Sequence, residues 1–441
     1  MLDLLKRKWL AMLMVVILLT PATLPFGVDK HVFASDCVTP GASVACPIMI
    51  YDAAGLNDMH SNLTAHYALG NHIDLSGGGW IPVGSGGNVS NAFRGSFNGN
   101  GYTIANLSIN TNESRVGLFG KTVEATIQNI GLVNVNIKGT GGPVSNVGGL
   151  VGEFTSSTIR NAYVTGTVEG AVVVGGLVGY ALGSPQSPSY IFNSYTDVEV
   201  TGSDPAKTGG LIGSLQEPYV ITTDSYYNLS KHASPNGSGL FTAEMKDATS
   251  YAPSWNLSGP NANTGEWRMI NGQTNPIHRT TYDQIFLQEL TIYDESLAPI
   301  ISNPPIPPLT YSAQVATDVS SVTVAVYKSY SQSSVTIDGD PVESKTITLP
   351  HGSKTVNITV TTPLVISGAA VSPYVVNYTR TVIREDGIDY PHRITTASGL
   401  AAIGTGLFAL NHSYELINDL DLDGLKLGTD RKRCSAVCGN I

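Results

Sequence analysis

Short runs of alternating apolar and polar residues recur through the first half of the chain. VNVNIKG spans residues 133–139, VTGTVEG spans 164–170 and TDVEVTG spans 196–202. An alternation with a period of two buries one set of side chains and leaves the other set in water, which is typical of a β-strand. Each run ends at a glycine, which favours a turn. The pattern predicts many short strands with little helix.

Two further phrases repeat in step with these runs. The first is rich in glycine and occurs as VGLFG (116–120), VGGLVG (147–152), VGGLVG (174–179) and TGGLIG (208–213). The second occurs as IQNIG, IRNAY and IFNSY, so that Asn129, Asn161 and Asn193 are each 32 residues apart, and Asp224 follows 31 residues later. A period of this size indicates structural units that stack on their neighbours.

A repeating unit of about 30 residues with two or three strands leaves little room for helices. We therefore predict an all-β fold that begins with a right-handed parallel β-helix, in which successive turns lie about 4.8 Å apart. In such a coil Asn129, Asn161 and Asn193 would form a ladder of hydrogen-bonded amides. Tyr163, Tyr195 and Tyr226 would stack two residues further on, either as packing, which we favour, or as a platform for sugar rings.

The repeated glycines are interpreted as structural corners of this coil. A glycine supplies the positive φ that a tight corner needs, and it leaves room for the turn above. The alternative is a loop that binds phosphate. Such a loop is followed directly by a helix, and its best-known form carries a lysine. Neither a helical pattern nor a lysine at that place follows these phrases. The predicted corner residues are Gly117, Gly120, Gly149, Gly152, Gly176, Gly179, Gly210 and Gly213.

The glycine corners, with I-x-N-[SA]-Y between them, resemble the GLUG motif repeats of bacterial surface proteins. The resemblance extends from Pro47 to Thr281, and it includes a lead-in at 54–84 and a closing segment at 255–277. It implies a bacterial protein that is secreted or attached to the cell surface. It supplies no catalytic residues.

A second domain is predicted at residues 284–386, where the composition changes. VSSVTVAVYK, KTVNITVTT and YVVNYTRTVI read as strands, and turn residues separate them every 8–12 positions, which is typical of an Ig-like β-sandwich. The order of its motifs resembles the cadherin-like β-sandwich of bacterial envelope proteins, which implies a spacer or an adhesive unit. No cluster of acidic linker residues is present, so the calcium sites of cadherins are not expected.

The sequence that opens the first domain then recurs: residues 391–424 parallel residues 47–77. We predict that residues 387–441 are the truncated start of a second GLUG-type domain, with a short helix at 398–405 and an atypical basic tail. Asp419, Asp421, Asp423 and Asp430 have the spacing of a calcium loop. Lys426 at the expected apolar position and the matching IDLSG of the first copy favour a strand instead, and we predict no metal site.

The N-terminus has the features of an export signal. Three basic residues at 6–8 precede an apolar run at 9–19, so we predict a signal peptide of residues 1–34 followed by the β-helix domain at 35–283. An uncleaved membrane anchor is the alternative. Cys37 and Cys46 could pair after export. The expected location is extracellular, either secreted or at the cell surface, without membrane contact after cleavage.

Composition excludes one class of partner. The chain has 24 Lys and Arg against 34 Asp and Glu, with a net charge of −10, whereas nucleic-acid-binding proteins cluster basic residues. We therefore expect no nucleic-acid partner. The expected partner is a cell-wall or extracellular glycan, or a surface protein of a host or neighbouring cell.

Signatures of enzymes, such as H-E-x-x-H and G-x-S-x-G, do not occur in the sequence. We therefore predict no catalytic residue and no cofactor, and expect an exported, non-enzymatic, modular surface protein with a structural or adhesive role. Two alternatives stay open: a carbohydrate-binding or carbohydrate-active β-helix protein, and the non-catalytic region of a larger surface peptidase.

Overall fold

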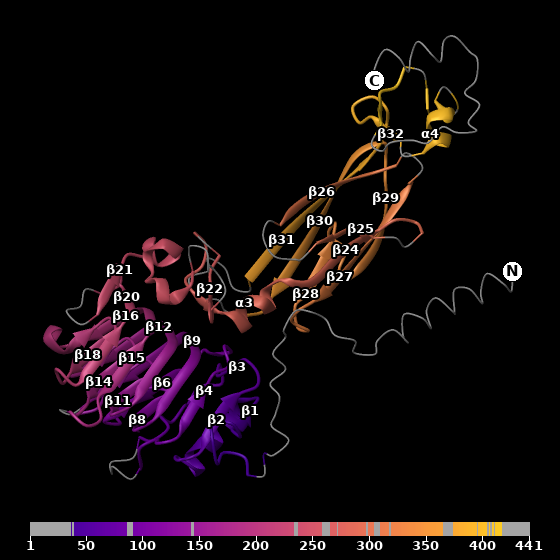
Figure 1. Cartoon of the computed structure of the whole chain (residues 1–441). Coiled ribbons are helices and arrows are strands. Elements are labelled where there is room, and N and C mark those ends of the chain that lie inside the picture. The colour runs from indigo at the N-terminus through magenta and orange to yellow at the C-terminus, as the bar shows by residue number, and fades with distance from the viewer. Residues whose placement is uncertain are drawn as a thin grey trace.

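The structure is a computed structural model, and it describes most of the chain from the first cysteine onward (Figure 1). The predicted signal peptide, the aspartates at 419–430 and the atypical basic tail lie outside the described residues. The described residues are 37, 39–85, 91–142, 145–232, 237–257, 265–270, 272–296, 299–303, 309–316, 319–364, 374–394, 396–403, 405, 408–409 and 411–416.

The first half of the chain winds into a parallel β-helix, which confirms the predicted fold class. All strand pairs in its three sheets are parallel. The largest sheet contains β1 (Ile48–Ile50), β2 (His66–Leu69), β4 (Ser96–Asn98), β9 (Thr126–Gly139), β12 (Thr158–Gly170), β16 (Tyr195–Gly202), β20 (Tyr226–Asn228) and β21 (Ser238–Leu240) in this order, with β3 (Ile73–Asp74), β5 (Thr103–Ala105), β6 (Ser108–Thr111), β15 (Ser189–Phe192) and β19 (Val220–Thr223) at its sides.

Two four-stranded sheets form the rest of the coil. The first contains β7 (Arg115–Val116), β10 (Asn146–Gly148), β13 (Val173–Gly175) and β17 (Thr208–Gly209). The second contains β8 (Phe119–Val123), β11 (Val151–Thr155), β14 (Val178–Leu182) and β18 (Ile212–Leu215). The four turns that begin at β7, β10, β13 and β17 each contribute one strand to both of these sheets and at least one strand to the largest sheet, which agrees with the repeated phrases.

Stacked apolar residues form the core of the coil. Ile127, Ile159 and Ile191 occupy the same register on neighbouring strands, and each is fully buried. Full burial of such a side chain stabilises a fold by about 1.5–3 kcal/mol, so the repeat of one apolar position accumulates a large stabilisation along the coil. At its start, α2 (Ala53–Asn57) and η1 (Asp58–Ser61) follow β1, and Asp52 caps α2 by accepting a hydrogen bond from Gly55 N.

A closing segment then runs back along the outside of the coil. It contains η4 (Glu244–Lys246), η5 (Ala248–Ser250), η6 (Pro253–Trp255), β22 (Trp267–Arg268), β23 (Ile277–His278) and α3 (Arg279–Ile285). Its contacts move steadily toward the first turn, from Trp255 with Asp224, through His278 with Asn161, to Thr280 with Asn100 and Gln284 with His72. The segment therefore brings the next domain to the beginning of the coil.

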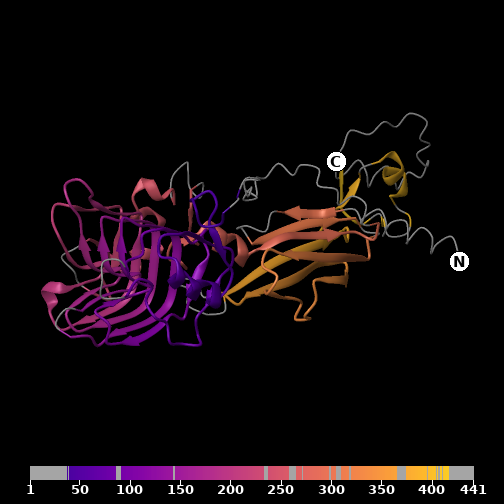
Figure 2. The same ribbon diagram turned by 90° about the horizontal axis from the view of Figure 1, so that it is seen from below.

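The next domain is a sandwich of two four-stranded sheets, and Figure 2 shows it extending from the β1 end of the coil. One sheet contains β25 (Pro299–Asn303), β24 (Leu287–Tyr293), β27 (Ser321–Lys328) and β29 (Ser344–Thr348). The other contains β26 (Thr310–Val315), β31 (Tyr374–Arg384), β30 (Gly352–Thr362) and β28 (Ser334–Ile337). Tyr282 and Ile285 of α3 pack into the core of this sandwich.

The last described residues repeat the opening of the coil. β32 (His392–Ile394) pairs in parallel with β33 (Tyr414–Leu416), with α4 (Ala397–Ala402) between them, as β1, α2 and β2 are arranged. Thr396 caps α4 by accepting a hydrogen bond from Gly399 N, which matches the cap at Asp52. The helix begins one residue before the predicted range of 398–405 and ends three residues before its end.

No helix among the described residues has both the length and the hydrophobicity required to span a membrane.

Candidate functional site

The predicted corner glycines lie at and just beyond the bends of the coil. The first member of each pair occupies the bend between two strands, and these are Gly117, Gly149, Gly176 and Gly210. The second member lies inside the strand that follows, and these are Gly120, Gly152, Gly179 and Gly213. All eight are described, and none has a positive φ. The expectation that they supply a left-handed conformation is therefore wrong.

Close packing between turns explains these glycines instead. A Cβ placed on Gly149 would lie within 3.0 Å of the carbonyl oxygen of Gly176, and one on Gly176 would lie equally close to that of Gly210. Real Cβ atoms do not approach backbone atoms this closely. The repeated glycine is therefore required where one turn of the coil contacts the next, and it leaves no open loop that could hold a phosphate.

The members of the predicted asparagine ladder are among the residues with a left-handed backbone. The φ angles of Asn129, Asn161, Asn193 and Asp224 are 52°, 50°, 44° and 47°. Asparagine and aspartate adopt this conformation more readily than other residues with a Cβ. Asn161 Nδ2 donates to Asn129 Oδ1 at 2.9 Å, and Asn129 Nδ2 donates to Asn98 Oδ1 at 3.2 Å.

The ladder changes its partner in the later turns. Asn193 Oδ1 and Asp224 Oδ2 both lie within hydrogen-bond distance of Ser254 Oγ, at 3.2 and 2.6 Å. The closing segment is thus hydrogen-bonded to the coil through the same column of side chains.

A second ladder was not predicted from the sequence. Asn134 Nδ2 donates to Asn106 Oδ1 at 2.7 Å, and Asn106 Nδ2 donates to Asp74 Oδ1 at 2.8 Å. Asn106 and Asn134 also have positive φ angles, of 59° and 57°. They are 28 residues apart, not 32, so a search at the period of the first ladder misses them.

Two of the three tyrosines in the predicted column are closed off from solvent, and the third, Tyr226, is partly buried. The rings of Tyr163 and Tyr195 stack with centroids 5.2 Å apart and an interplanar angle of 2°, and both side chains are fully buried. Trp255 and Trp267 of the closing segment cover them, with centroids 6.0–6.3 Å from these rings. The geometry favours packing, and these two rings are not accessible to a sugar.

His278 belongs to the same cluster and could not be identified from the sequence. Its imidazole is fully buried and stacks on Trp267 at 4.4 Å. Nε2 donates to the carbonyl oxygen of Asn161 at 2.9 Å, because a carbonyl only accepts. Burial lowers the pKa of His278 to about 4, so the imidazole is neutral at physiological pH. It acts as a fixed donor that joins the closing segment to the coil.

A buried ion cluster lies on another sheet of the coil. Glu153 is 2.6 Å from Lys121 Nζ and 2.5 Å from Arg115 Nε. Burial raises the pKa of Glu153, but hydrogen bonds and charge attraction from Lys121 and Arg115 together lower it by more, so the net shift of the pKa is downward. The carboxylate of Glu153 is thus paired with Lys121 and Arg115. Among the described residues, no group of three or more His, Cys, Asp or Glu is placed to hold a metal ion.

An open groove lies on the outward face of the largest sheet, with a volume of about 570 Å³. Its floor consists of the outward side chains of β4, β9 and β12, which alternate with the buried residues of the same strands. One row runs through Ser96 and Thr126, and a parallel row runs through Asn98, Gln128 and Arg160. The size is typical of sites that bind small ligands.

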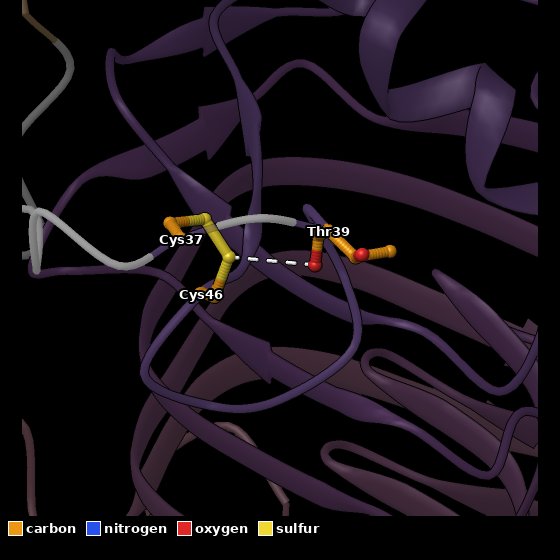
Figure 3. The surroundings of a disulfide bond; sticks show 3 residues. All are labelled: Cys37, Thr39 and Cys46. Atoms are coloured by element: carbon orange, nitrogen blue, oxygen red, sulfur yellow. Dashed lines mark hydrogen bonds between the residues drawn. A yellow bond between two sulfur atoms is a disulfide. The ribbon is translucent and has the colours of Figure 1, made fainter.

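A disulfide-closed loop forms one wall of the groove. Cys37 and Cys46 are bonded, with their Cα atoms 5.4 Å apart, and Cys46 Sγ lies 3.4 Å from the carbonyl oxygen of Thr39 (Figure 3). Gly41 O accepts a hydrogen bond from His66 N, which ties the loop to β2. Val44 and its neighbours at 45 and 47 therefore have a fixed place beside the floor.

The side chains of the groove suit binding. Arg160 is exposed, and its Nε donates to Gln128 Oε1 at 2.7 Å. The described residues that line the groove otherwise carry amides, hydroxyls and apolar groups, and the imidazole of His66 adjoins the floor, with Nδ1 2.8 Å from Ser96 Oγ. Such groups can form hydrogen bonds to a ligand.

Comparison with known proteins identifies one repeat directly: residues 144–169 match the GLUG motif family. Halomucin from Haloquadratum walsbyi is 34% identical over 153 residues, which is 31% of this chain and 2% of halomucin. The "Putative Gly-rich membrane protein" of Evansella cellulosilytica is 36% identical over 116 residues, which is 24% of this chain and 13% of that protein. The chain therefore spans a small part of either relative.

Among solved structures, a crystal structure titled as a "putative immunoglobulin A1 protease from Bacteroides ovatus" has a TM-score of 0.33 and 17% identity, covering 55% of this chain and 95% of that one. The chain thus contains a β-helix that carries a GLUG motif at residues 144–169, and its sequence is similar to parts of halomucin and of a protein named for a membrane.

Proposed function

We propose that this chain is an exported, non-enzymatic module of a cell-surface protein, with a structural and adhesive role. The observation that carries the proposal is the groove walled by the Cys37–Cys46 loop, because it combines a disulfide with a surface lined by hydroxyl, amide and guanidinium groups. Disulfides form and persist outside the reducing cytosol. The relationship to a protein named for a membrane supports the same location.

The architecture suits display at a distance from an attachment point. The coil and the sandwich are both packed around apolar cores, and Thr280 and Thr281 of α3 donate to the carbonyl oxygens of Asn100 and Gly101. The tie between the two domains therefore uses ordered hydrogen bonds as well as the buried residues of α3. Such a tie holds the groove at a defined place on the molecule.

The location is tested by labelling intact native cells with a biotin reagent that does not cross membranes. We expect the chain to be labelled while a cytosolic protein of the same cells is not. Alkylation before reduction, followed by mass spectrometry, should leave Cys37 and Cys46 unmodified, and Cys46→Ser should expose Cys37 to the reagent. A chain found only in the cytosol, with both thiols alkylated, would contradict the proposal.

A further inference from the structure

We infer that the groove binds an acidic oligosaccharide, with Arg160 holding a carboxylate of one sugar unit. This inference names a ligand for the adhesive role proposed above and therefore depends on that role. It is carried by three features of the outward face of the largest sheet: a double row of polar side chains, the guanidinium of Arg160, and a pair of partly exposed aromatic rings.

The polar rows provide hydrogen-bonding groups at the spacing of the coil. Thr126 lies between Ser96 and Thr158 on neighbouring strands, and Gln128 lies between Asn98 and Arg160. Adjacent strands in a sheet are about 4.8 Å apart, so both rows present a donor or acceptor at regular intervals across the strands. A chain of sugar units lying across the strands meets these groups with its hydroxyls.

Arg160 gives the groove its charge preference. It is the charged residue among the described lining residues, so the groove is locally positive although the whole chain carries a net charge of −10. Its Nε is held by Gln128, which orients the guanidinium and leaves the edge formed by Nη1 and Nη2 for a ligand. That edge matches the two oxygens of a carboxylate, and the charged hydrogen bonds it forms are the strong ones.

An aromatic pair continues the same rows beyond Arg160. Tyr190 lies beside Thr158 and Phe192 lies beside Arg160, and the two rings stack at 5.5 Å with an interplanar angle of 16°. Both side chains are partly exposed. Their apolar surface next to hydroxyls and amides suits a sugar ring, which is polar at its edge and apolar on its C–H face, since an aromatic face is electron-rich.

The same face is poorly suited to an extended peptide. Peptides that bind sheets do so by adding a strand at a free edge, where unpaired backbone groups are available. Strands β9 and β12 are paired on both sides, so the floor of the groove offers side chains and no free edge. A ligand rich in hydroxyls uses such a surface more fully than a polypeptide backbone does.

The test is isothermal titration calorimetry on the full chain with the hexamer of galacturonate, and with a neutral glucose hexamer and hexaglutamate as comparison ligands. The variants are Arg160→Gln and Tyr190→Ala. Lys138→Gln is the matched control, because Lys138 is a partly exposed cation that pairs with Glu169 elsewhere on the same sheet.

We expect the galacturonate hexamer to bind. Arg160→Gln should weaken its affinity by about 10- to 100-fold, because a hydrogen bond to a charged group contributes a binding free energy of about this size. Lys138→Gln should leave the affinity unchanged. Tyr190→Ala should lower the affinity for both the galacturonate hexamer and the glucose hexamer. Absence of binding, equal affinity for the neutral hexamer, an unaffected Arg160→Gln, or binding of hexaglutamate alone would each overturn the inference. Surface labelling of cells is independent of these outcomes, so it distinguishes a wrong ligand from a wrong location.

Discussion

Asn161 donates a hydrogen bond from its amide to the side-chain oxygen of Asn129, across 2.9 Å and one turn of the coil. Both backbones are left-handed, with φ angles of 50° and 52°. One residue type thus meets two demands at once, because asparagine tolerates this conformation and carries both a donor and an acceptor. The recurrence of asparagine at a 32-residue interval follows from the geometry of the coil.

The two demands on Asn161 can be separated by two substitutions. Asn161→Gly keeps the left-handed conformation and loses the hydrogen bond, whereas Asn161→Ala loses both. We expect the alanine variant to unfold more easily than the glycine variant by about 1 kcal/mol, which is the cost of placing a residue with a Cβ in this conformation. Urea unfolding of both variants measures the difference. Equal stabilities would show that the conformation has no cost at this position.

The sequence predicts the coil well because its signal is repeated and local. The register of Ile127, Ile159 and Ile191 follows from residues at a fixed spacing, and alternation assigns each to the buried face. His278 gives no such signal. Its partner Asn161 is 117 residues away, and only the path of the closing segment brings them together.

The candidate site was harder to predict than the fold. Arg160 occupies an ordinary outward position of a strand, and sequence alternation marks it only as solvent-facing. Its importance depends on the neighbouring strands and on the loop closed by Cys37 and Cys46, which pair as the sequence allowed. The eight glycines show a different limit: their spacing marks the places where turns meet, but it does not distinguish close packing from a left-handed backbone.

Gly176 provides a test of the close-packing explanation. A Cβ there would come within 3.0 Å of Gly210 O and of the Val198 side chain, so Gly176→Ala should destabilise the coil by about 1–3 kcal/mol. Gly77→Ala is the control, because a Cβ at Gly77 meets no atom within 4 Å and its φ is not positive. Thermal unfolding compares the two. If Gly176→Ala were as stable as Gly77→Ala, contact between turns would not explain the repeated glycine.

The two buried tyrosines should respond differently to loss of their hydroxyl groups. Tyr195 Oη donates to the carbonyl oxygen of Pro276 at 2.7 Å, whereas Tyr163 Oη is buried without a hydrogen-bond partner among the described residues. Tyr195→Phe should cost about 1 kcal/mol or more, because it leaves a buried carbonyl without this donor. Tyr163→Phe should be neutral or stabilising. The free energies of unfolding, measured in urea, check the order, and a larger loss for Tyr163→Phe would contradict it.

Acid should weaken the coil through His278. An unfolded histidine has a pKa of about 6.5. Burial holds the pKa of His278 near 4 in the folded chain, with a smaller opposing effect from its hydrogen bond to Asn161. Above pH 6.5 the imidazole is neutral in both states and makes no pH-dependent contribution. Between pH 6.5 and 4 the unfolded state binds a proton that the folded state does not, so stability falls with the pH. Below pH 4 both states are protonated and this loss is complete.

A pKa difference of this size corresponds to a loss on the order of 3 kcal/mol by pH 4. Urea unfolding of the full chain at several values between pH 7 and pH 4 measures the total loss, to which His72 also contributes because burial lowers its pKa to about 4 as well. His278→Gln should reduce the pH dependence by the share of His278, because glutamine does not titrate and keeps an amide donor for Asn161 O. His60→Gln serves as the control for the substitution itself, since His60 is exposed. The decisive comparison is between the slopes of the variants and not between their absolute stabilities, because a repacked cluster lowers stability equally at every pH. An unaltered slope in His278→Gln would mean that the imidazole takes up its proton equally well in the folded and unfolded chain.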